Sequence, residues 1–160
     1  MNLPTSNNLP INKLASVFGS TSATYKFYWL IALIELVEEG NIEIPKRKIF
    51  STMISNSWYT INYFHISFGK QDNLQIAVER ILKEENLTID EKKNKLETCL
   101  ENSTNKETIN QLLHFDKNVP HWFLSPWFPK INNETDNQQK SRIYSDSQSF
   151  VNDSLYALHK

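Results

Sequence analysis

Apolar residues recur at helical spacing along much of this chain, most densely between residues 23 and 64. Within residues 23–39 nearly every turn carries apolar or aromatic side chains, and Gly40 with the following Asn provides a C-terminal stop. Residues 20–22, Ser-Thr-Ser, offer an N-cap. A helix that is apolar on most sides is typical of the centre of a core. The pattern therefore predicts that residues 23–39 form a central buried helix.

A second helix is predicted to begin behind Pro45, because proline is pre-organised for the first helical position. Its apolar residues recur at helical spacing through about residue 64, at positions 49, 50, 53, 54, 58 and 61. The opposite side carries Lys48, Thr52, Ser55, Tyr59 and Asn62. Residues 42–44 alternate between apolar and polar, which would suit either a short β segment or a crossing to this helix.

Shorter periodic stretches predict four more helices. They cover residues 11–18, residues 74–85, residues from a capping box at 88–91 to about 101, and residues 105–115. Gly69 lies in a stretch, residues 67–72, that predicts a turn. Together these patterns predict a mainly α fold, a compact bundle of about five to six helices around the central one.

Residues 119–129, VPHWFLSPWFP, combine three prolines with bulky aromatic side chains. This composition predicts an irregular segment that is packed on the surface of the domain. Two interpretations of it stay open. The segment either clamps a loop to its own core, which we favour, or offers a surface for a partner, because Trp and Phe dominate interface hot spots.

The polar stretches set the expected boundaries of the domain. Residues 1–10 are polar and interrupted by prolines, which predicts a flexible N-terminus. The helical domain is then expected over residues 11–128, followed by a flexible polar segment over residues 129–149. Residues 150–160 restore hydrophobicity, and we expect them to start a further element that a longer, untruncated chain would complete.

Composition narrows the classes of function. The 160 residues carry a net charge of −1, so any attraction to nucleic acid must come from a local patch. A single cysteine, Cys99, excludes an internal disulfide framework and a cysteine-based zinc site. The longest apolar run, residues 27–37, contains Glu35 and is too short to span a bilayer. With no basic and apolar leader at the N-terminus, we expect a soluble cytoplasmic protein without a membrane partner.

Motifs for catalysis are missing from the sequence. The four histidines stand apart without metal-ligand spacing, and no serine lies in a nucleophile elbow. Three isolated glycines cannot build a phosphate-binding loop. The carboxylate pairs at 38–39 and 84–85 are best interpreted as solvated faces. We therefore assign no catalytic residue and expect no metal or cofactor, and an enzyme whose site the sequence does not reveal stays open.

The cluster of Lys46, Arg47 and Lys48 is the strongest sign of a partner. These cations lie in the first turn of a predicted helix, where like charges oppose the helix dipole. Such a position suits contacts to DNA phosphates, helped by the N–H groups of the helix start. The alternative is a solvated helix end balanced by Glu43 and nearby acids. If DNA is bound, the side chains expected to contact its backbone or base edges are Thr52, Ser55, Tyr59 and Asn62.

Several motifs occur together in an order that points to a family. YKFYW at residues 25–29 is followed by IPKR at 44–47, MISNSWY at 53–59, VPHWFLSPWF at 119–128 and a terminal IYSDSQSFVNDSLYAL. In this combination the chain resembles the N-terminal region of bacterial proteins with an HNH-endonuclease domain. The resemblance spans most of residues 10–158. In that family the His-Asn-His core, which holds a divalent metal and activates water, lies well downstream and has no counterpart here.

The resemblance implies a non-catalytic N-terminal domain of an HNH-type endonuclease system. We expect this domain to recognise or position DNA, and to work with a downstream nuclease module or a partner chain. The alternative is a protein–protein interaction module, or a small stand-alone helical protein that does not bind nucleic acid.

Overall fold

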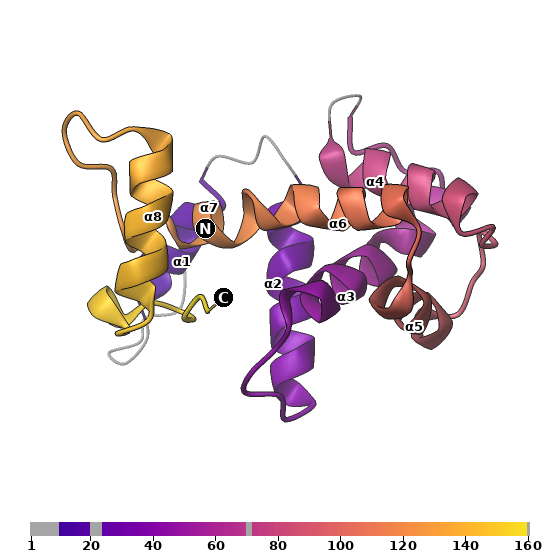
Figure 1. Cartoon of the computed structure of the whole chain (residues 1–160), viewed down its shortest axis with the longest axis horizontal. Helices are drawn as coiled ribbons and strands as arrows, with labels where there is room; N and C mark the ends of the chain where they lie inside the picture. The colour runs from indigo at the N-terminus through magenta and orange to yellow at the C-terminus, as the bar shows by residue number, and fades with distance from the viewer. Residues whose placement is uncertain (1–9, 20–23, 70–71, 160) are drawn as a thin grey trace. The chain divides into compact units, whose positions relative to one another are not determined.

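The computed structural model describes residues 10–19, 24–69 and 72–159, and all regular structure within these ranges is helical (Figure 1). The mainly α prediction is therefore confirmed. Residues 42–44 do not form a strand, so of the two alternatives the crossing to the next helix is the one observed. The helices are α1 (Ile11–Val17), α2 (Tyr25–Glu38), α3 (Lys46–Trp58), α4 (Asn73–Glu84), α5 (Lys93–Asn102), α6 (Lys106–Asp116), α7 (Val119–Leu124) and α8 (Asp136–Ser147), with a π-helix η1 (Tyr59–Tyr63) and a 3-10 helix η2 (Val151–Asp153).

The described chain forms two compact units instead of one domain over residues 11–128. Unit 1 contains residues 10–19 together with residues 118–159, and unit 2 contains residues 24–117. The aromatic segment, which ends at the predicted boundary at 128, lies in unit 1. Phe123 of α7 packs edge-on against Phe18, which follows α1, so this segment belongs with the N-terminal helix.

Helix α3 is the centre of unit 2 and contacts α2, α4, α5, α6 and η1. All six predicted apolar positions of this helix and of η1 are buried. Small side chains on the remaining sides allow the neighbouring helices to approach closely. Ser51 and Ser57 satisfy their hydroxyl groups by donating to the backbone oxygens of Arg47 and Ile54, so their burial leaves no unpaired donor.

Helix α2 has the predicted extent, but it is not the central buried helix. Its buried residues are Trp29, Ala32 and Leu36, which lie on one face at helical spacing. The opposite face is apolar too and remains exposed. Helix α2 thus carries apolar side chains on most of its sides but buries only one side. The N-cap expected for it at residues 20–22 lies outside the described residues.

The starts of α2 and α4 are tied together by one carboxylate. Asp72 caps α4 by accepting hydrogen bonds from the N–H groups of Leu74 and Gln75. Its other oxygen accepts from the N–H and the hydroxyl of Thr24, the residue before α2. The predicted capping box at residues 88–91, in contrast, forms a turn, and α5 begins only at Lys93.

Helix α7 corrects the expectation that residues 119–129 are irregular. Pro120 lies in the first turn, where the missing N–H would have no helical partner anyway. Phe123, Leu124, Trp127 and Phe128 are fully buried in unit 1. The Trp127 indole N–H donates to the backbone oxygen of Asp153 at 2.9 Å. The clamp interpretation of the aromatic segment is therefore confirmed.

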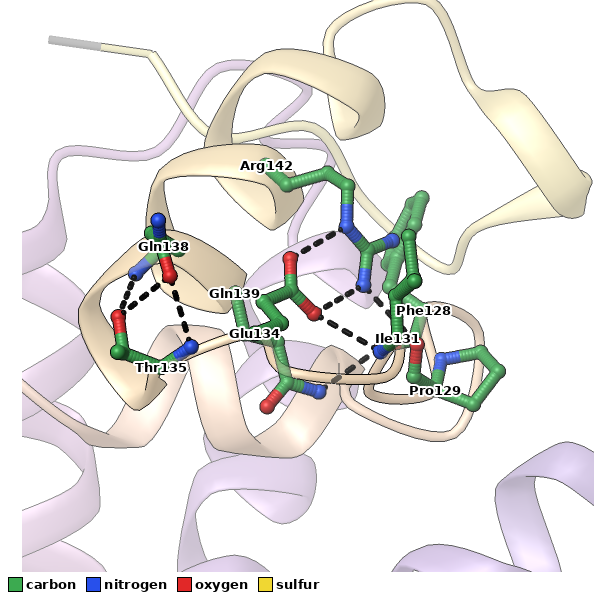
Figure 2. A network of polar contacts seen from close by, with 8 residues as sticks. All are labelled: Phe128, Pro129, Ile131, Glu134, Thr135, Gln138, Gln139 and Arg142. Carbon is green, nitrogen blue, oxygen red and sulfur yellow. Dashed lines mark hydrogen bonds and ion pairs between the residues drawn. The ribbon is translucent and has the colours of Figure 1, made fainter.

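Helix α8 occupies the segment that the sequence predicted to be flexible. Thr135 and Gln138 form a reciprocal capping box at its start (Figure 2). Its buried face consists of Gln139, Ile143 and Ser147, and Gln139 donates to the Phe128 backbone oxygen at 3.0 Å. Because two of these three residues are polar, the helix carries almost no hydrophobic periodicity.

An ion pair fixes the loop before α8. The Arg142 guanidinium donates to both oxygens of Glu134, at 2.8 and 2.9 Å, and to the Pro129 backbone oxygen at 2.9 Å (Figure 2). The Ile131 N–H also donates to Glu134. These hydrogen bonds, with Arg142 the largest cause, lower the pKa of Glu134 from 4.5 to about 2.

The depressed pKa predicts how the stability of unit 1 depends on pH. Unfolding restores the usual pKa of Glu134, so its contribution to stability is present above about pH 5 and lost as the pH falls toward about 2. We expect the unfolding free energies of the wild type and of Glu134→Gln to differ most near neutral pH and to converge near pH 2. Amide hydrogen exchange of α8, measured across this range, checks the difference. If the difference in unfolding free energy between the two proteins stayed the same near pH 2, the role of this carboxylate would be contradicted.

Residues 150–159 pack within unit 1, although the sequence suggested the start of a further element. The Tyr156 hydroxyl donates to the Pro120 backbone oxygen at 2.6 Å, and the Leu158 N–H donates to the Ser147 hydroxyl. Phe150 and Asn152 both have positive φ, so the chain turns sharply after α8.

Candidate functional site

The basic side chains predicted to form a site at the start of α3 contact other residues of unit 2. Lys46 forms an ion pair with Asp116 of α6 at 2.8 Å. The Lys48 amine lies 3.4 Å from the Asn41 side-chain oxygen. Both lysines are half-buried, so neither presents a fully extended cation to solvent.

Arg47 caps the C-terminal end of α5. Its Nε and Nη2 donate to the Leu100 backbone oxygen at 3.0 and 2.9 Å, and Nη2 also donates to the Ser103 backbone oxygen at 2.5 Å. The last carbonyl groups of a helix have no helical partner and carry partial negative charge, so a guanidinium there is stabilising. Arg47 therefore has a structural role that its place in a basic triplet does not reveal.

Glu85 completes this polar cluster. Its carboxylate accepts hydrogen bonds from the hydroxyls of Ser103 and Thr108, the latter at 2.6 Å, and Cys99 lies 3.7 Å away. Burial raises the pKa of Glu85, but these hydrogen bonds and the nearby Arg47 outweigh it, so the pKa lies below its usual value. Burial and the Glu85 charge raise the pKa of the Cys99 thiol. A protonated thiol is a poor nucleophile, so the contacts of this cluster support the fold and do not activate Cys99.

The polar residues predicted to contact DNA do not share an exposed surface. Thr52, Ser55 and Asn62 are buried. Tyr59 is exposed, but its hydroxyl donates to the Asp90 backbone oxygen at 3.0 Å. Placing these residues on a solvent-facing side was wrong, because α3 is covered on several sides. Base edges can be read only by side chains that reach them, and these three side chains are buried in unit 2.

The concave features of unit 2 are small. A surface hollow between α3 and α6 is lined by Phe50, Ile109, Leu112 and Leu113 and by the Lys46–Asp116 pair. Its volume of about 120 Å³ is below the ~300–1,000 Å³ typical of ligand pockets. Within the described ranges, no group of three or more His, Cys, Asp or Glu residues could hold a metal ion. In these same ranges no helix is both long and apolar enough to cross a membrane.

The exposed side of α2 is the most distinctive surface of unit 2. Four large apolar residues follow one another at intervals of three or four positions, which places them on one side of the helix. We call this surface the α2 apolar face. It consists of Phe27, Ile31, Ile34 and Val37, whose exposed fractions are 44, 49, 49 and 59%. Ile42, 96% exposed, follows shortly after the helix.

Carboxylates gather at the C-terminal end of the α2 apolar face. Glu38, Glu39 and Glu43, which we call the acidic rim, are exposed, and none of them forms an ion pair with a described residue. Glu97 lies near this end as well. Burial raises its pKa, and the charges of Glu35 and Glu39 raise it further.

Glu35 differs from the acidic rim because it is held by neighbours. Lys93 pairs with one of its oxygens, and the Asn56 amide donates to the other at 2.9 Å. These contacts outweigh the effect of burial and lower the pKa of Glu35. The free acidic charge is therefore concentrated beyond Glu35, toward the end of the helix.

A second group of exposed apolar side chains lies on and just after η1. Tyr63 is in edge contact with Tyr59 and with Phe64, with ring centroids 6.0 and 5.1 Å apart. All three are exposed, as is Ile66. The π-helix that presents them was not predicted, since the spacing of residues 49–61 fits an ordinary α-helix. Short π-helical turns often occur at functional sites.

No protein family, no curated protein and no solved structure matches this chain. The resemblance to the N-terminal region of HNH-endonuclease proteins therefore stays a prediction from the sequence motifs.

Proposed function

We propose that this chain is a protein-interaction module whose α2 apolar face receives the apolar side of a partner helix. The observation that carries the proposal is the exposure of four large apolar side chains on one side of a helix whose other side is buried. A contiguous apolar surface of this kind is typical of an interaction site. Binding of amphipathic helices through side chains at such spacing is a common mode of peptide recognition.

The surface differs from the one that the sequence suggested for an interaction module. The aromatic segment at 122–128 is largely buried, so it cannot dock a partner without unfolding unit 1. The small hollow and the missing metal cluster in the described ranges give no support to an enzymatic site.

The expected affinity is moderate. Burying one large apolar side chain completely contributes about 1.5–3 kcal/mol. Since about half of each side chain of the α2 apolar face is already covered, covering the rest contributes about 3–6 kcal/mol before the cost of association. Such a surface suits a reversible complex.

Substitution on the α2 apolar face is expected to weaken binding without destabilising the protein. The probe is a fluorescent synthetic amphipathic helix with leucines on one side and glutamines on the other. Ile31→Ser should weaken its binding about fivefold, because one half-exposed apolar side chain contributes about 1 kcal/mol. Fluorescence anisotropy titrations measure the affinity.

The matched control is Ile131→Ser in unit 1, since Ile131 is an exposed isoleucine of similar accessibility, at 58%. It should bind the probe like the wild type. Equal weakening by both substitutions, or no binding of any amphipathic helix, would refute the proposed function.

DNA recognition or positioning within an HNH-type system stays a prediction from the sequence. No observation on α3 favours it over the interaction module, because Arg47 and Lys46 are occupied by backbone carbonyls and by Asp116.

A further inference from the structure

The acidic rim makes the two ends of the α2 apolar face different in charge. Glu38 lies in the last turn of α2, Glu39 is its C-cap, and Glu43 follows in the loop. No basic residue lies in the last turn, although cations are favoured there by the negative end of the helix dipole. The C-terminal end of the face is therefore strongly negative, and Glu35 farther back is already paired with Lys93.

We infer that the partner is an amphipathic helix with lysines or arginines next to its apolar side, so that its cations meet the acidic rim while its apolar side chains cover the α2 apolar face. This inference rests on the proposed function and adds the chemistry of the partner. The apolar residues supply affinity, and the charge complementarity supplies orientation, because the acidic rim lies at the C-terminal end of the face.

The charges argue against other occupants of the face. Nucleic acid and anionic lipid surfaces carry the same sign as the acidic rim and would be repelled. A second copy of the chain would bring two acidic rims together in a parallel pairing. In an antiparallel pairing, each rim would lie opposite the Phe27 end of the other helix, where the half-buried Lys26 is a single cation against three carboxylates. A basic amphipathic helix leaves none of these charges unmatched.

The test compares three synthetic peptides with the same leucine positions and with lysine, glutamine or glutamate on the polar side. At low salt the Leu/Lys peptide should bind the wild type about tenfold more tightly than the Leu/Gln peptide, and the Leu/Glu peptide more weakly still. Raising the salt to about 1 M should remove most of this difference, because exposed charges are then screened within about 3 Å.

Neutralising the acidic rim should remove the preference. In Glu38→Gln/Glu39→Gln/Glu43→Gln the Leu/Lys and Leu/Gln peptides should bind equally. The matched control is Glu79→Gln/Glu84→Gln/Asp90→Asn, which removes the same charge from exposed acids of unit 2 outside α2. This control should keep the tenfold preference.

The possible outcomes distinguish a failure of the inference from a failure of the proposed function. If the Leu/Gln and Leu/Lys peptides bind the wild type equally and Ile31→Ser weakens both, the inference is refuted and the proposed function stands. If no peptide binds, the proposed function fails. A preference that the control triple variant also loses would trace the effect to overall charge and would refute the inference. Self-association of the wild type that Ile31→Ser abolishes, or binding to anionic vesicles through α2, would likewise replace the basic helix as occupant.

Discussion

Replacing Arg47 with methionine is expected to lower the free energy of unfolding of unit 2 by about 2–4 kcal/mol, because hydrogen bonds from a charged group to partly buried acceptors contribute about 1.5–3 kcal/mol and unpaired groups add a further cost. The variant loses all three hydrogen bonds to the backbone oxygens of Leu100 and Ser103, and Glu85 loses a nearby cation. Methionine keeps much of the aliphatic stem, so the loss reports the guanidinium. Native-state amide hydrogen exchange of α3 and α5 measures the effect.

Lys48→Met is the matched control for Arg47→Met, since it removes the same charge from the neighbouring position. Lys48 makes only a 3.4 Å contact to Asn41, so its replacement should change the unfolding free energy by less than about 0.5 kcal/mol. Equal, small effects of the two substitutions would show that Arg47 does not stabilise the end of α5. The basic triplet would then be free to serve a partner, as the sequence suggested.

Truncating Trp127 to alanine is expected to destabilise unit 1 by about 3–5 kcal/mol, because it empties a core site filled by a large aromatic ring. Trp127 is fully buried, and its indole N–H donates a hydrogen bond to the Asp153 backbone oxygen. Asn152 donates to the Trp127 backbone oxygen, which alanine keeps, so the loss reports the aromatic ring and its indole donor. Amide hydrogen exchange of α7 and α8 measures the loss.

Trp127→Phe separates volume from hydrogen bonding at the same site. Phenylalanine fills most of the space and lacks the indole donor, so we expect a smaller cost of about 1–2 kcal/mol. A negligible effect of Trp127→Ala would mean that the aromatic segment is not part of the core, and would restore it as a candidate docking surface.

The helices with strong hydrophobic periodicity could be predicted closely from the sequence. For α4 and α6, the apolar spacing gives nearly the full extent of each helix. Helix α8 could not be predicted in this way, because Gln139 and Ser147 on its buried face are polar. The pattern Thr135-x-x-Gln138, a capping box, is the signal that would have indicated it.

The candidate site was harder to predict because exposure is decided by tertiary packing. Ile31 and Leu36 look equally apolar in the sequence, yet one is half exposed and the other buried. Thr52 and Ser55 look like surface residues, yet α3 lies between α2, α5 and α6. Arg47 finds its acceptors 53 and 56 residues further along the chain, and no local pattern encodes such a contact.

The most direct test of the interaction surface is an NMR titration that follows the isoleucine methyl groups while the Leu/Lys peptide is added. If the α2 apolar face is the binding surface, the methyl signals of Ile31 and Ile34 shift in a saturable way, and those of Ile109 and Ile131 stay in place. Saturable shifts confined to isoleucines outside α2, or none at any isoleucine while the peptide binds, would contradict the account.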